Sequence, residues 1–208
     1  MSTMPVPSVW YNPHMESLCI LGDSIVNGFM DSEKGGWVSR LRAARFAHHD
    51  DVPVYELGIP SETTTSLLLR FDTDIGPRAP DCIIFAIGTN DSKYHPKLLA
   101  PETPPMAFEG NLRTLFEKAL TICPQVFALG LLGCDEARTV PLPGSLASYY
   151  AEHMGEYNAQ IELVAAQKGV TFIPMLHLVP HEHLHDGLHP DGEGHQLIAD
   201  RVSKAVFS

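Results

Sequence analysis

The chain has 208 residues, 44% of them hydrophobic and 19% charged, which suits a single globular domain with one sizeable core. Its 25 acidic residues outnumber its 14 Lys and Arg residues, giving a formal net charge of -11. Because an acidic surface repels phosphate groups, this balance argues against nucleic acid and anionic membranes as partners.

We expect one domain over residues 1–208, with residues 1–15 as an extended, proline-containing arm. This N-terminal stretch lacks the charged and apolar regions of a signal peptide, and no segment reaches the length of a membrane helix. The sequence therefore predicts a cytoplasmic protein without membrane insertion. No C-x-x-C pair occurs, and the cysteines are expected to be free thiols in a reducing compartment. Only Cys134, directly after a predicted strand, leaves open whether it is buried or faces a cleft.

Short apolar runs predict five strands, at residues 17–21, 52–57, 81–87, 125–132 and 170–173. Apolar residues at helical spacing predict helices at residues 36–48, 62–74, 107–122, 146–168 and 191–206. Ser61 and Asp191 are the expected N-caps of two of these helices. Tyr149 and Tyr150 lie at an irregular helix start, either lining a pocket or belonging to the core.

This alternation predicts an α/β fold, a flavodoxin-like three-layer α/β/α arrangement with a central parallel sheet of about five strands. Ligands of such sheets bind at the carboxyl ends of the strands. The residues just after the strands are therefore the candidate functional residues. The irregular connections at residues 91–105 and 133–145 are expected over the same edge, as walls of a substrate pocket.

Three short motifs lie at the ends of the first three predicted strands, and a fourth follows the last strand. They are Leu21-Gly22-Asp23-Ser24, Leu57-Gly58-Ile59, Gly88-Thr89-Asn90-Asp91 and Asp186-Gly187-Leu188-His189-Pro190. Each alone is ordinary turn or helix-cap chemistry. In this order, over residues of about 18 to 195, they resemble the SGNH hydrolases, also called the GDSL lipase/acylhydrolase family.

The resemblance implies a role for each motif. Ser24 matches the family nucleophile, His189 its base and Asp186 the carboxylate that orients the base. The Ser24 and Gly58 N–H groups and the Asn90 side chain match the oxyanion hole. A glycine at position 58 is expected to let the substrate approach the backbone. The sequence departs from the family pattern around Gly58, with Glu56 and Ser61 nearby, and has Ile25 where the family usually has Leu.

The implied activity is cleavage of a small-molecule carboxylic ester through an acyl-enzyme on Ser24, with no metal or organic cofactor. A carbohydrate O-deacetylase and a thioesterase would use the same residues and stay open, as does the oligomeric state. A non-enzymatic binding module is the alternative from another class, and the intact motifs argue against it. The α/β-hydrolase pattern G-x-S-x-G does not occur.

A second pattern competes with this interpretation. Residues His181-Glu182-His183-Leu184-His185 match H-E-x-x-H, in which His181, Glu182 and His185 would form the zinc site of a metallohydrolase. Pro180 and Pro190 bracket the segment and leave little room for the helix that this motif needs. We therefore expect loop histidines here. Whether the histidine-rich segment 177–195 binds a metal adventitiously stays open.

Overall fold

The computed structural model describes residues 15, 17–47 and 52–207. At its centre lies a five-stranded sheet of order β2-β1-β3-β6-β7, in which every neighbouring pair is parallel. The strands are β1 (Leu18–Gly22), β2 (Val54–Gly58), β3 (Cys82–Ala86), β6 (Gln125–Leu129) and β7 (Thr171–Ile173). The predicted parallel sheet of about five strands is thus confirmed.

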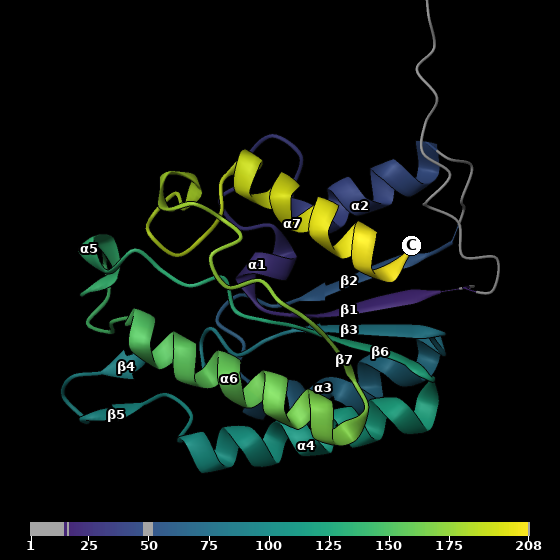
Figure 1. The fold of residues 1–208 in the computed structure, drawn as a ribbon, viewed down its shortest axis with the longest axis horizontal. Coiled ribbons are helices and arrows are strands. Elements are labelled where there is room, and N and C mark those ends of the chain that lie inside the picture. Colours follow the sequence, from purple (N-terminus) through teal and green to yellow (C-terminus); the bar gives the residue numbers. More distant parts are fainter. Residues whose placement is uncertain (1–14, 16, 48–51, 208) are drawn as a thin grey trace, which may run out of the picture.

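Helices cover both faces of the sheet, as Figure 1 shows. One face carries α2 (Gly36–Ala47) and α7 (Gly192–Val206), which pack against each other. The opposite face carries α3 (Thr64–Ile75), α4 (Pro105–Ile122) and α6 (Ala151–Lys168). Shorter helices are α1 (Ser24–Asn27), α5 (Glu136–Thr139), and the 3-10 helices η1 (Gly76–Arg78) and η2 (His181–His183).

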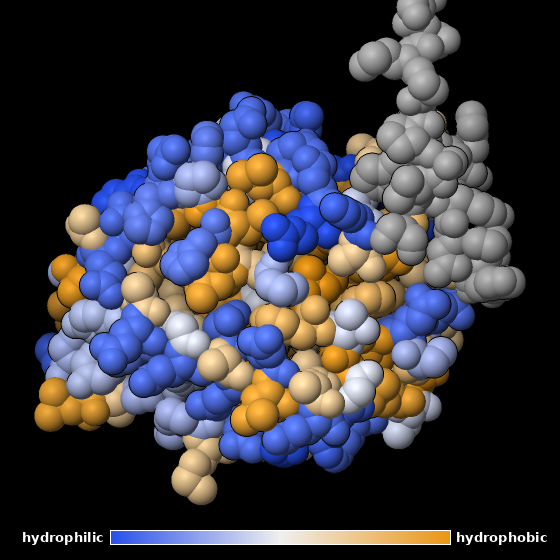
Figure 2. Space-filling view, in the orientation of Figure 1, coloured by the Kyte–Doolittle hydropathy of each residue, from blue (hydrophilic) through white to orange (hydrophobic). Residues whose placement is uncertain are grey.

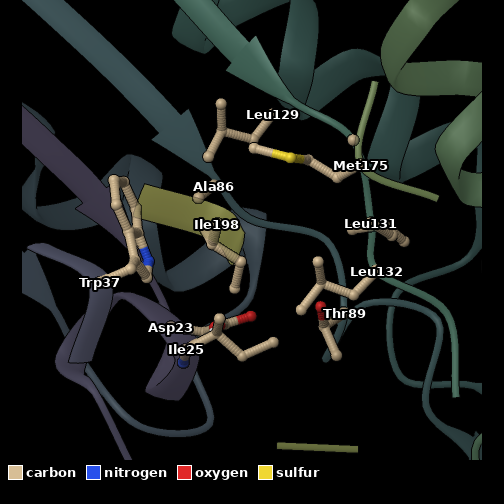
Figure 3. A pocket seen from close by; sticks show the side chains of 11 residues that line it. Asp23, Ile25, Trp37, Ala86, Thr89, Leu129, Leu131, Leu132, Met175 and Ile198 are labelled. Carbon is tan, nitrogen blue, oxygen red and sulfur yellow. Dashed lines mark hydrogen bonds between the residues drawn. The ribbon is translucent and has the colours of Figure 1, made fainter. Parts of the chain in front are cut away.

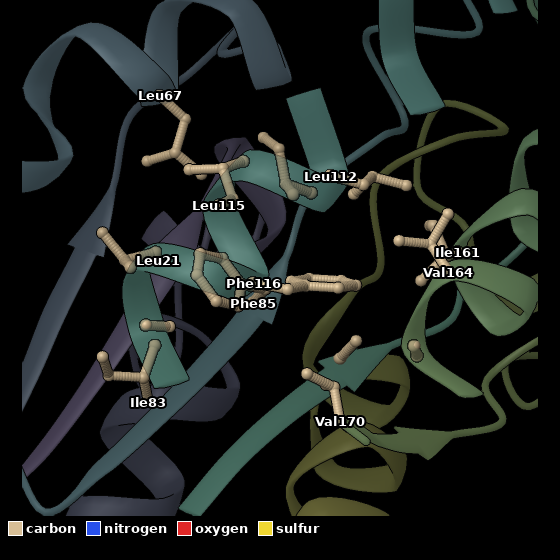
Figure 4. Packing of buried hydrophobic residues seen from close by; sticks show 14 of the residues in the cluster. Leu21, Leu67, Ile83, Phe85, Leu112, Leu115, Phe116, Ile161, Val164 and Val170 are labelled. Atoms are coloured by element: carbon tan, nitrogen blue, oxygen red, sulfur yellow. The ribbon is translucent and has the colours of Figure 1, made fainter. Parts of the chain in front are cut away.

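Alternating side chains of the central strands fill two separate cores. In β1, Cys19 and Leu21 belong to the core beneath α3, α4 and α6, whereas Leu18 and Ile20 belong to the core beneath α2 and α7. This is the two-residue period of a strand that is buried on both sides. Figure 4 shows the first core, with Phe85 and Phe116 at its centre.

The register of the sheet places the candidate residues at one edge. Gly22 of β1 is paired with Gly58 of β2 on one side and with Ala86 of β3 on the other. The three strands therefore end level with one another, on the left in Figure 1, and the chain that follows each of them emerges at the same edge. The short hairpin of β4 (Tyr94–His95) and β5 (Ala100–Pro101) and helix α5 lie at this edge too.

Three local predictions are wrong. The helix expected over residues 146–168 begins at Ala151, with Tyr150 as its N-cap. The helix expected from residue 62 with Ser61 as its cap begins at Thr64, and its N-cap is Thr63. Thr63 and Ser66 form a reciprocal capping box, whereas Ser61 has a φ of 65° and belongs to the preceding turn. Ser24 is the first residue of α1, a four-residue helix that was not among the predicted elements.

Several other expectations have definite outcomes. Residues 1–14 of the expected arm lie outside the described residues, whereas Met15 is buried in the core beneath α2 and α7. Asp191 caps α7 as predicted. All four cysteines are buried and free, and the Cys134 thiol faces the carbonyl of Tyr149 rather than a cleft.

The surface of the described part mixes charged and apolar side chains (Figure 2). Polar residues cover the outer helices on the face shown, and apolar side chains gather at the tip of the β4–β5 hairpin, the region of the exposed Leu98 and Leu99. Within the described ranges, no helix combines the length and the apolar content that a membrane crossing requires.

Candidate active site

Ser24, His189 and Asp186 form a continuous row of hydrogen bonds. Ser24 Oγ lies 2.9 Å from His189 Nε2, and His189 Nδ1 lies 2.7 Å from Asp186 Oδ2. A carboxylate only accepts hydrogen bonds, so Nδ1 carries the ring proton. Nε2 then presents its lone pair to the Ser24 hydroxyl, which is the tautomer that a general base requires.

Asp186 stays ionised in this arrangement. Burial opposes ionisation, but hydrogen bonds from the ring and the backbone N–H of His189 hold the pKa of Asp186 well below its usual range. The N–H of Leu188 donates to the same carboxylate at 3.0 Å. The Asp186–His189 turn thus presents a fixed negative charge behind the imidazole.

Helix α1 positions Ser24. Asp23 is its N-cap, with Oδ1 accepting from the N–H of Ile25 at 2.9 Å, and Gly28 ends the helix with a φ of 83°. Only 7% of Ser24 is exposed. The serine therefore sits at a sharp, capped change of direction directly after β1, and its hydroxyl is turned towards His189 rather than into open solvent.

Asp23 is a buried acid beside this serine. Burial raises its pKa to about 7, which the hydrogen bond from Ile25 and the nearby His189 only partly offset. Its Oδ2 atom has no hydrogen-bond partner among the described residues. Figure 3 shows Asp23 at the wall of a cavity of about 30 Å³ whose other walls include Thr89, Trp37 and Ile198. This cavity is large enough for a water molecule beside the Asp23 carboxyl group.

Gly58 contacts α1 directly. A Cβ atom at this position would lie 2.5 Å from the Asn27 nitrogen, 2.8 Å from the Asp23 carbonyl oxygen and 2.8 Å from Val26 Cβ. The structure thus gives a packing reason for the glycine, beside the expected approach of a substrate. Gly58 permits the helix that carries Ser24 to lie against the end of β2.

Asn90 and its neighbour Asp91 have different functions in the structure. Asp91 accepts two hydrogen bonds from the N–H of Thr64 and one from its hydroxyl, and so binds the first turn of α3. Asn90 is not a helix cap. Its Nδ2 donates to the carbonyl of Glu62 at 3.1 Å, and its Oδ1 accepts from the hydroxyl of Tyr149 at 2.9 Å.

The histidine-rich segment does not form the zinc-binding helix. Its H-E-x-x-H residues form the short η2 turn and then an extended Leu184, so His181 and His185 do not share a helical face. Among the described residues, no group of three or more His, Cys, Asp or Glu side chains is arranged to hold a metal ion. His195 is buried between α7 and α2, and burial lowers its pKa to about 4.

Both expected wall segments lie at the site edge, and both are tied to other elements. The 91–105 connection forms the β4–β5 hairpin, and Tyr94 exchanges two backbone hydrogen bonds with Ser148. The 133–145 connection carries α5, and Asp135 at its N-cap donates its N–H to the carbonyl of Gly187 at 2.8 Å. The 91–105 connection is therefore bonded to the segment before α6, and the 133–145 connection to the turn that carries Asp186 and His189.

Two residues at the site add to the sequence-based candidates: Phe29 was not among them, and Tyr149 was left open between a pocket wall and the core. Phe29 makes a T-shaped contact with the ring of His189, with 4.9 Å between ring centroids, and 43% of Phe29 is exposed. Tyr149 contacts Asn90 and is buried. Phe29 follows the first motif by five residues and carries no signal of its own. Tyr149 had no predicted partner, because Asn90 lies 59 residues away in sequence.

The fold is shared with solved hydrolase structures. A lipase/acylhydrolase from Enterococcus faecalis superposes with a TM-score of 0.78 at 22% identity, covering 92% of this chain and 95% of that chain. An acetylxylan esterase from Geobacillus stearothermophilus superposes with a TM-score of 0.73 at 19% identity, covering 93% and 95%. These likenesses concern the fold.

The sequence comparisons agree with the fold. Among curated proteins, an arylesterase from Vibrio mimicus is 25% identical over 197 residues, which are 92% of this chain and 88% of that protein. Residues 20–197 match the model of the GDSL-like lipase/acylhydrolase family. The fold and these matches define a carboxylic ester hydrolase. The chain belongs to the GDSL-like lipase/acylhydrolase family, as its four motifs predict.

Proposed function

We propose that the chain is a serine esterase that cleaves carboxylic esters through an acyl-enzyme on Ser24. The observation that carries the proposal is the row from Ser24 Oγ to His189 Nε2 at 2.9 Å and from His189 Nδ1 to Asp186 Oδ2 at 2.7 Å. A serine hydroxyl becomes a nucleophile when an adjacent base removes its proton, and a carboxylate behind that base fixes its tautomer.

In the first half of the reaction, Ser24 Oγ bonds to the ester carbonyl carbon while its proton moves to His189 Nε2. The carbonyl π electrons move to the oxygen, and this oxyanion accepts hydrogen bonds from the Ser24 N–H, the Gly58 N–H and Asn90 Nδ2. When the oxyanion collapses, the bond from carbon to the leaving oxygen breaks, and His189 donates its proton to the departing alcohol. Asp186 stabilises the imidazolium between these two transfers.

In the second half, a water molecule replaces the alcohol. His189 removes a proton from the water as its oxygen bonds to the acyl carbon, and the same oxyanion donors hold the carbonyl oxygen. Collapse then breaks the bond to Ser24, and the proton on His189 returns to the serine oxygen. The products are a carboxylic acid and an alcohol, and the enzyme is regenerated.

Removal of the Ser24 hydroxyl tests this proposal. We expect Ser24→Ala to lower kcat on p-nitrophenyl acetate by about a thousandfold or more, and to abolish labelling by a fluorophosphonate probe. Ser203→Ala is the matched control, because Ser203 is also buried but lies in α7. Wild-type activity in a folded Ser24→Ala protein, or covalent labelling at another residue, would contradict the proposal.

For the substrate, the exposed ring of Phe29 favours an ester of an aromatic alcohol. This ring packs against the ring of His189, the residue that would protonate the leaving oxygen, so it lies where the alcohol departs. Offset and edge contacts between aromatic rings contribute about 0.5–1.5 kcal/mol beyond the buried area. The arylesterase relative agrees with this assignment.

Two esters with the same acetyl group separate this substrate class from carbohydrate deacetylation. We expect kcat/KM to be higher for phenyl acetate than for an acetylated xylo-oligosaccharide, and Phe29→Ala to raise KM for phenyl acetate more than KM for ethyl acetate. A higher kcat/KM for the sugar ester would overturn the aromatic assignment. If Ser24→Ala still abolished activity, the assignment of Ser24 as the nucleophile would be unaffected.

A further inference from the structure

Tyr149 is a buried residue that directly precedes the N-cap of α6. Its side chain reaches the candidate oxyanion-hole residue, with its hydroxyl oxygen 2.9 Å from Asn90 Oδ1. Only 3% of Tyr149 and 5% of Asn90 are exposed, so solvent does not compete for this contact. A buried hydrogen bond between a phenol and a side-chain amide is therefore built into the site.

The partners of Asn90 determine which end of its amide faces which way. The two ends of an amide have nearly the same shape, and a phenol can either donate or accept, so Tyr149 alone does not fix the orientation. The carbonyl of Glu62, 3.1 Å from Nδ2, can only accept. The amide nitrogen therefore lies towards Glu62, and Tyr149 must donate its proton to Oδ1. Nδ2 then keeps a second hydrogen, which Glu62 does not use.

Both partners of Asn90 are held in place. Glu62 accepts a hydrogen bond from Arg70 Nε at 2.7 Å, and Arg70 also donates to the carbonyl of Leu57 at 2.7 Å. Burial, reinforced by the charge of Asp23, raises the pKa of Tyr149 well above its ordinary range. The phenol therefore remains a proton donor wherever an esterase would work.

Helix α5 fixes the backbone of Tyr149 and also contacts the turn that carries His189. Thr139 accepts from the Tyr149 N–H at 3.1 Å, and its hydroxyl donates to the Tyr149 carbonyl at 2.8 Å. From the same helix, Arg138 Nη2 donates to the carbonyl of His181 at 2.6 Å and Nη1 to that of His185 at 3.3 Å. One short helix thus links the Asn90 side of the site to the His189 side.

We infer that Tyr149 is a positioning residue, whose hydrogen bond to Oδ1 holds the Asn90 amide so that the free Nδ2–H donates to the oxyanion. The inference rests on the proposed function, in which Asn90 is an oxyanion donor. Loss of the phenol hydroxyl leaves Oδ1 buried without its donor. Rotation of the Asn90 amide is then no longer opposed by this hydrogen bond. A rotated amide turns the lone pairs of Oδ1, instead of an Nδ2 proton, towards the negatively charged oxyanion.

The first test compares two buried tyrosines. Tyr149→Phe should lower kcat on p-nitrophenyl acetate by about ten- to a hundredfold with KM within about twofold, because an oxyanion donor acts mainly in the transition state and its full loss costs about 10²–10³. Tyr157→Phe is the matched control, since the Tyr157 hydroxyl is also buried but donates to the carbonyl of Thr103. It should leave kcat within about twofold.

A double-mutant cycle separates positioning from a general structural effect. Asn90→Ala alone should lower kcat by about 10²–10³. In the Asn90→Ala background, Tyr149→Phe should cause no further loss, because there is no amide left to orient. A loss of the same size in both backgrounds, or an effect on KM alone, would overturn the inference. If Asn90→Ala itself leaves kcat unchanged, the proposed oxyanion hole is wrong, and this outcome is distinct from failure of the Tyr149 inference.

A second variant keeps the inference testable if Tyr149→Phe does not fold. Thr139→Val removes the hydroxyl that donates to the Tyr149 carbonyl and leaves the phenol in the protein. We expect a smaller loss of kcat in the same direction, with KM unchanged and with no loss in the Asn90→Ala background. An unchanged kcat in folded Thr139→Val, together with an unfolded Tyr149→Phe, would contradict positioning of Asn90 through this helix.

Discussion

Asp186 binds His189 through both the ring and the backbone. One carboxylate oxygen accepts from the ring Nδ1–H at 2.7 Å, and the other accepts from the backbone N–H at 2.8 Å. The first bond sets the tautomer of the imidazole, and the second sets the turn that carries it. The Asp186 side chain therefore has both an electrostatic and a structural role. A substitution that keeps the backbone hydrogen bond but removes the charge can separate the two roles.

Asp186→Asn makes this separation. The amide oxygen can still accept from the backbone N–H, but the amide nitrogen then faces Nδ1 and favours a proton on Nε2, the wrong tautomer. We expect kcat to fall by about 10³–10⁴ with little change in melting temperature. Asp191→Asn is the matched control, because Asp191 pairs with His183 at 3.2 Å in the same way and lies outside the candidate row. Equal losses in both variants would contradict the assignment of Asp186.

Asp23→Asn should change how stability depends on pH. The pKa of Asp23 is about 7 in the folded protein and about 4 in an unfolded chain, so the folded state keeps its proton over this range while the unfolded state releases it. The stabilising contribution of Asp23 is thus complete below pH ~4 and is lost as pH rises through about 7. Asn at position 23 does not titrate and still accepts from the N–H of Ile25.

The measurement is the melting temperature of wild type and Asp23→Asn between pH 4 and pH 8. We expect the difference, variant minus wild type, to increase with pH from about 4 and to level off once pH has passed about 7. Asp200→Asn, a substitution on the exposed side of α7, is the control for a general change in net charge. A difference that stays constant with pH would show that the Asp23 carboxyl ionises alike in the folded and unfolded states.

Gly58→Ala should displace the nucleophile. The new methyl group would overlap the Asp23 carbonyl and the Asn27 nitrogen, which are backbone atoms of α1 and its cap and cannot rotate away. We expect kcat to fall by about tenfold or more, with a lower melting temperature. Gly110→Ala is the control, because a Cβ there meets nothing within 4 Å in the middle of α4. That variant should keep full activity and gain up to about 1 kcal/mol of stability.

Activity should not depend on the H-E-x-x-H side chains. His181 and His185 are exposed on the η2 turn and after it, and the turn is held through their backbone carbonyls by Arg138. We expect His181→Ala and His185→Ala to leave kcat within about twofold, and EDTA to leave the wild-type rate unchanged. Loss of activity on chelation, restored by zinc, would favour a metallohydrolase.

Much of the fold follows from short-range patterns. Buried strands appear as apolar runs. β1 and β2 end on the glycines of their motifs, Gly22 and Gly58, and β3 ends two residues before Gly88. Parallel strands bring those ends to one edge, which is why Ser24, Gly58 and Asn90 were predicted together. The position of Ser24 within α1 was not predictable, because four residues are too few to show a helical period.

The missed features depend on contacts between distant residues. Ser61 and Thr63 are both suitable N-cap residues for α3. The N-cap is Thr63 because its side chain and that of Ser66 form reciprocal hydrogen bonds with the backbone. The β4–β5 hairpin has two residues in each strand and is anchored by Ser148. The bond of Tyr149 to Asn90 joins residues 59 positions apart. No local pattern encodes such pairings.

The hydrogen bond from Ser24 to His189 spans 165 residues. The two groups come from distant parts of the chain. Helix α2 follows α1, which carries Ser24, and α7 follows the turn that carries His189. These two helices contact each other, and the Nδ1 atom of His195 in α7 accepts the N–H of Trp37 in α2. Ester cleavage therefore reports on completion of the whole fold. During refolding, recovery of the ester cleavage rate should follow the slowest step that brings Ser24 and His189 together. A chain truncated between β7 and η2 should be inactive even where its sheet has formed.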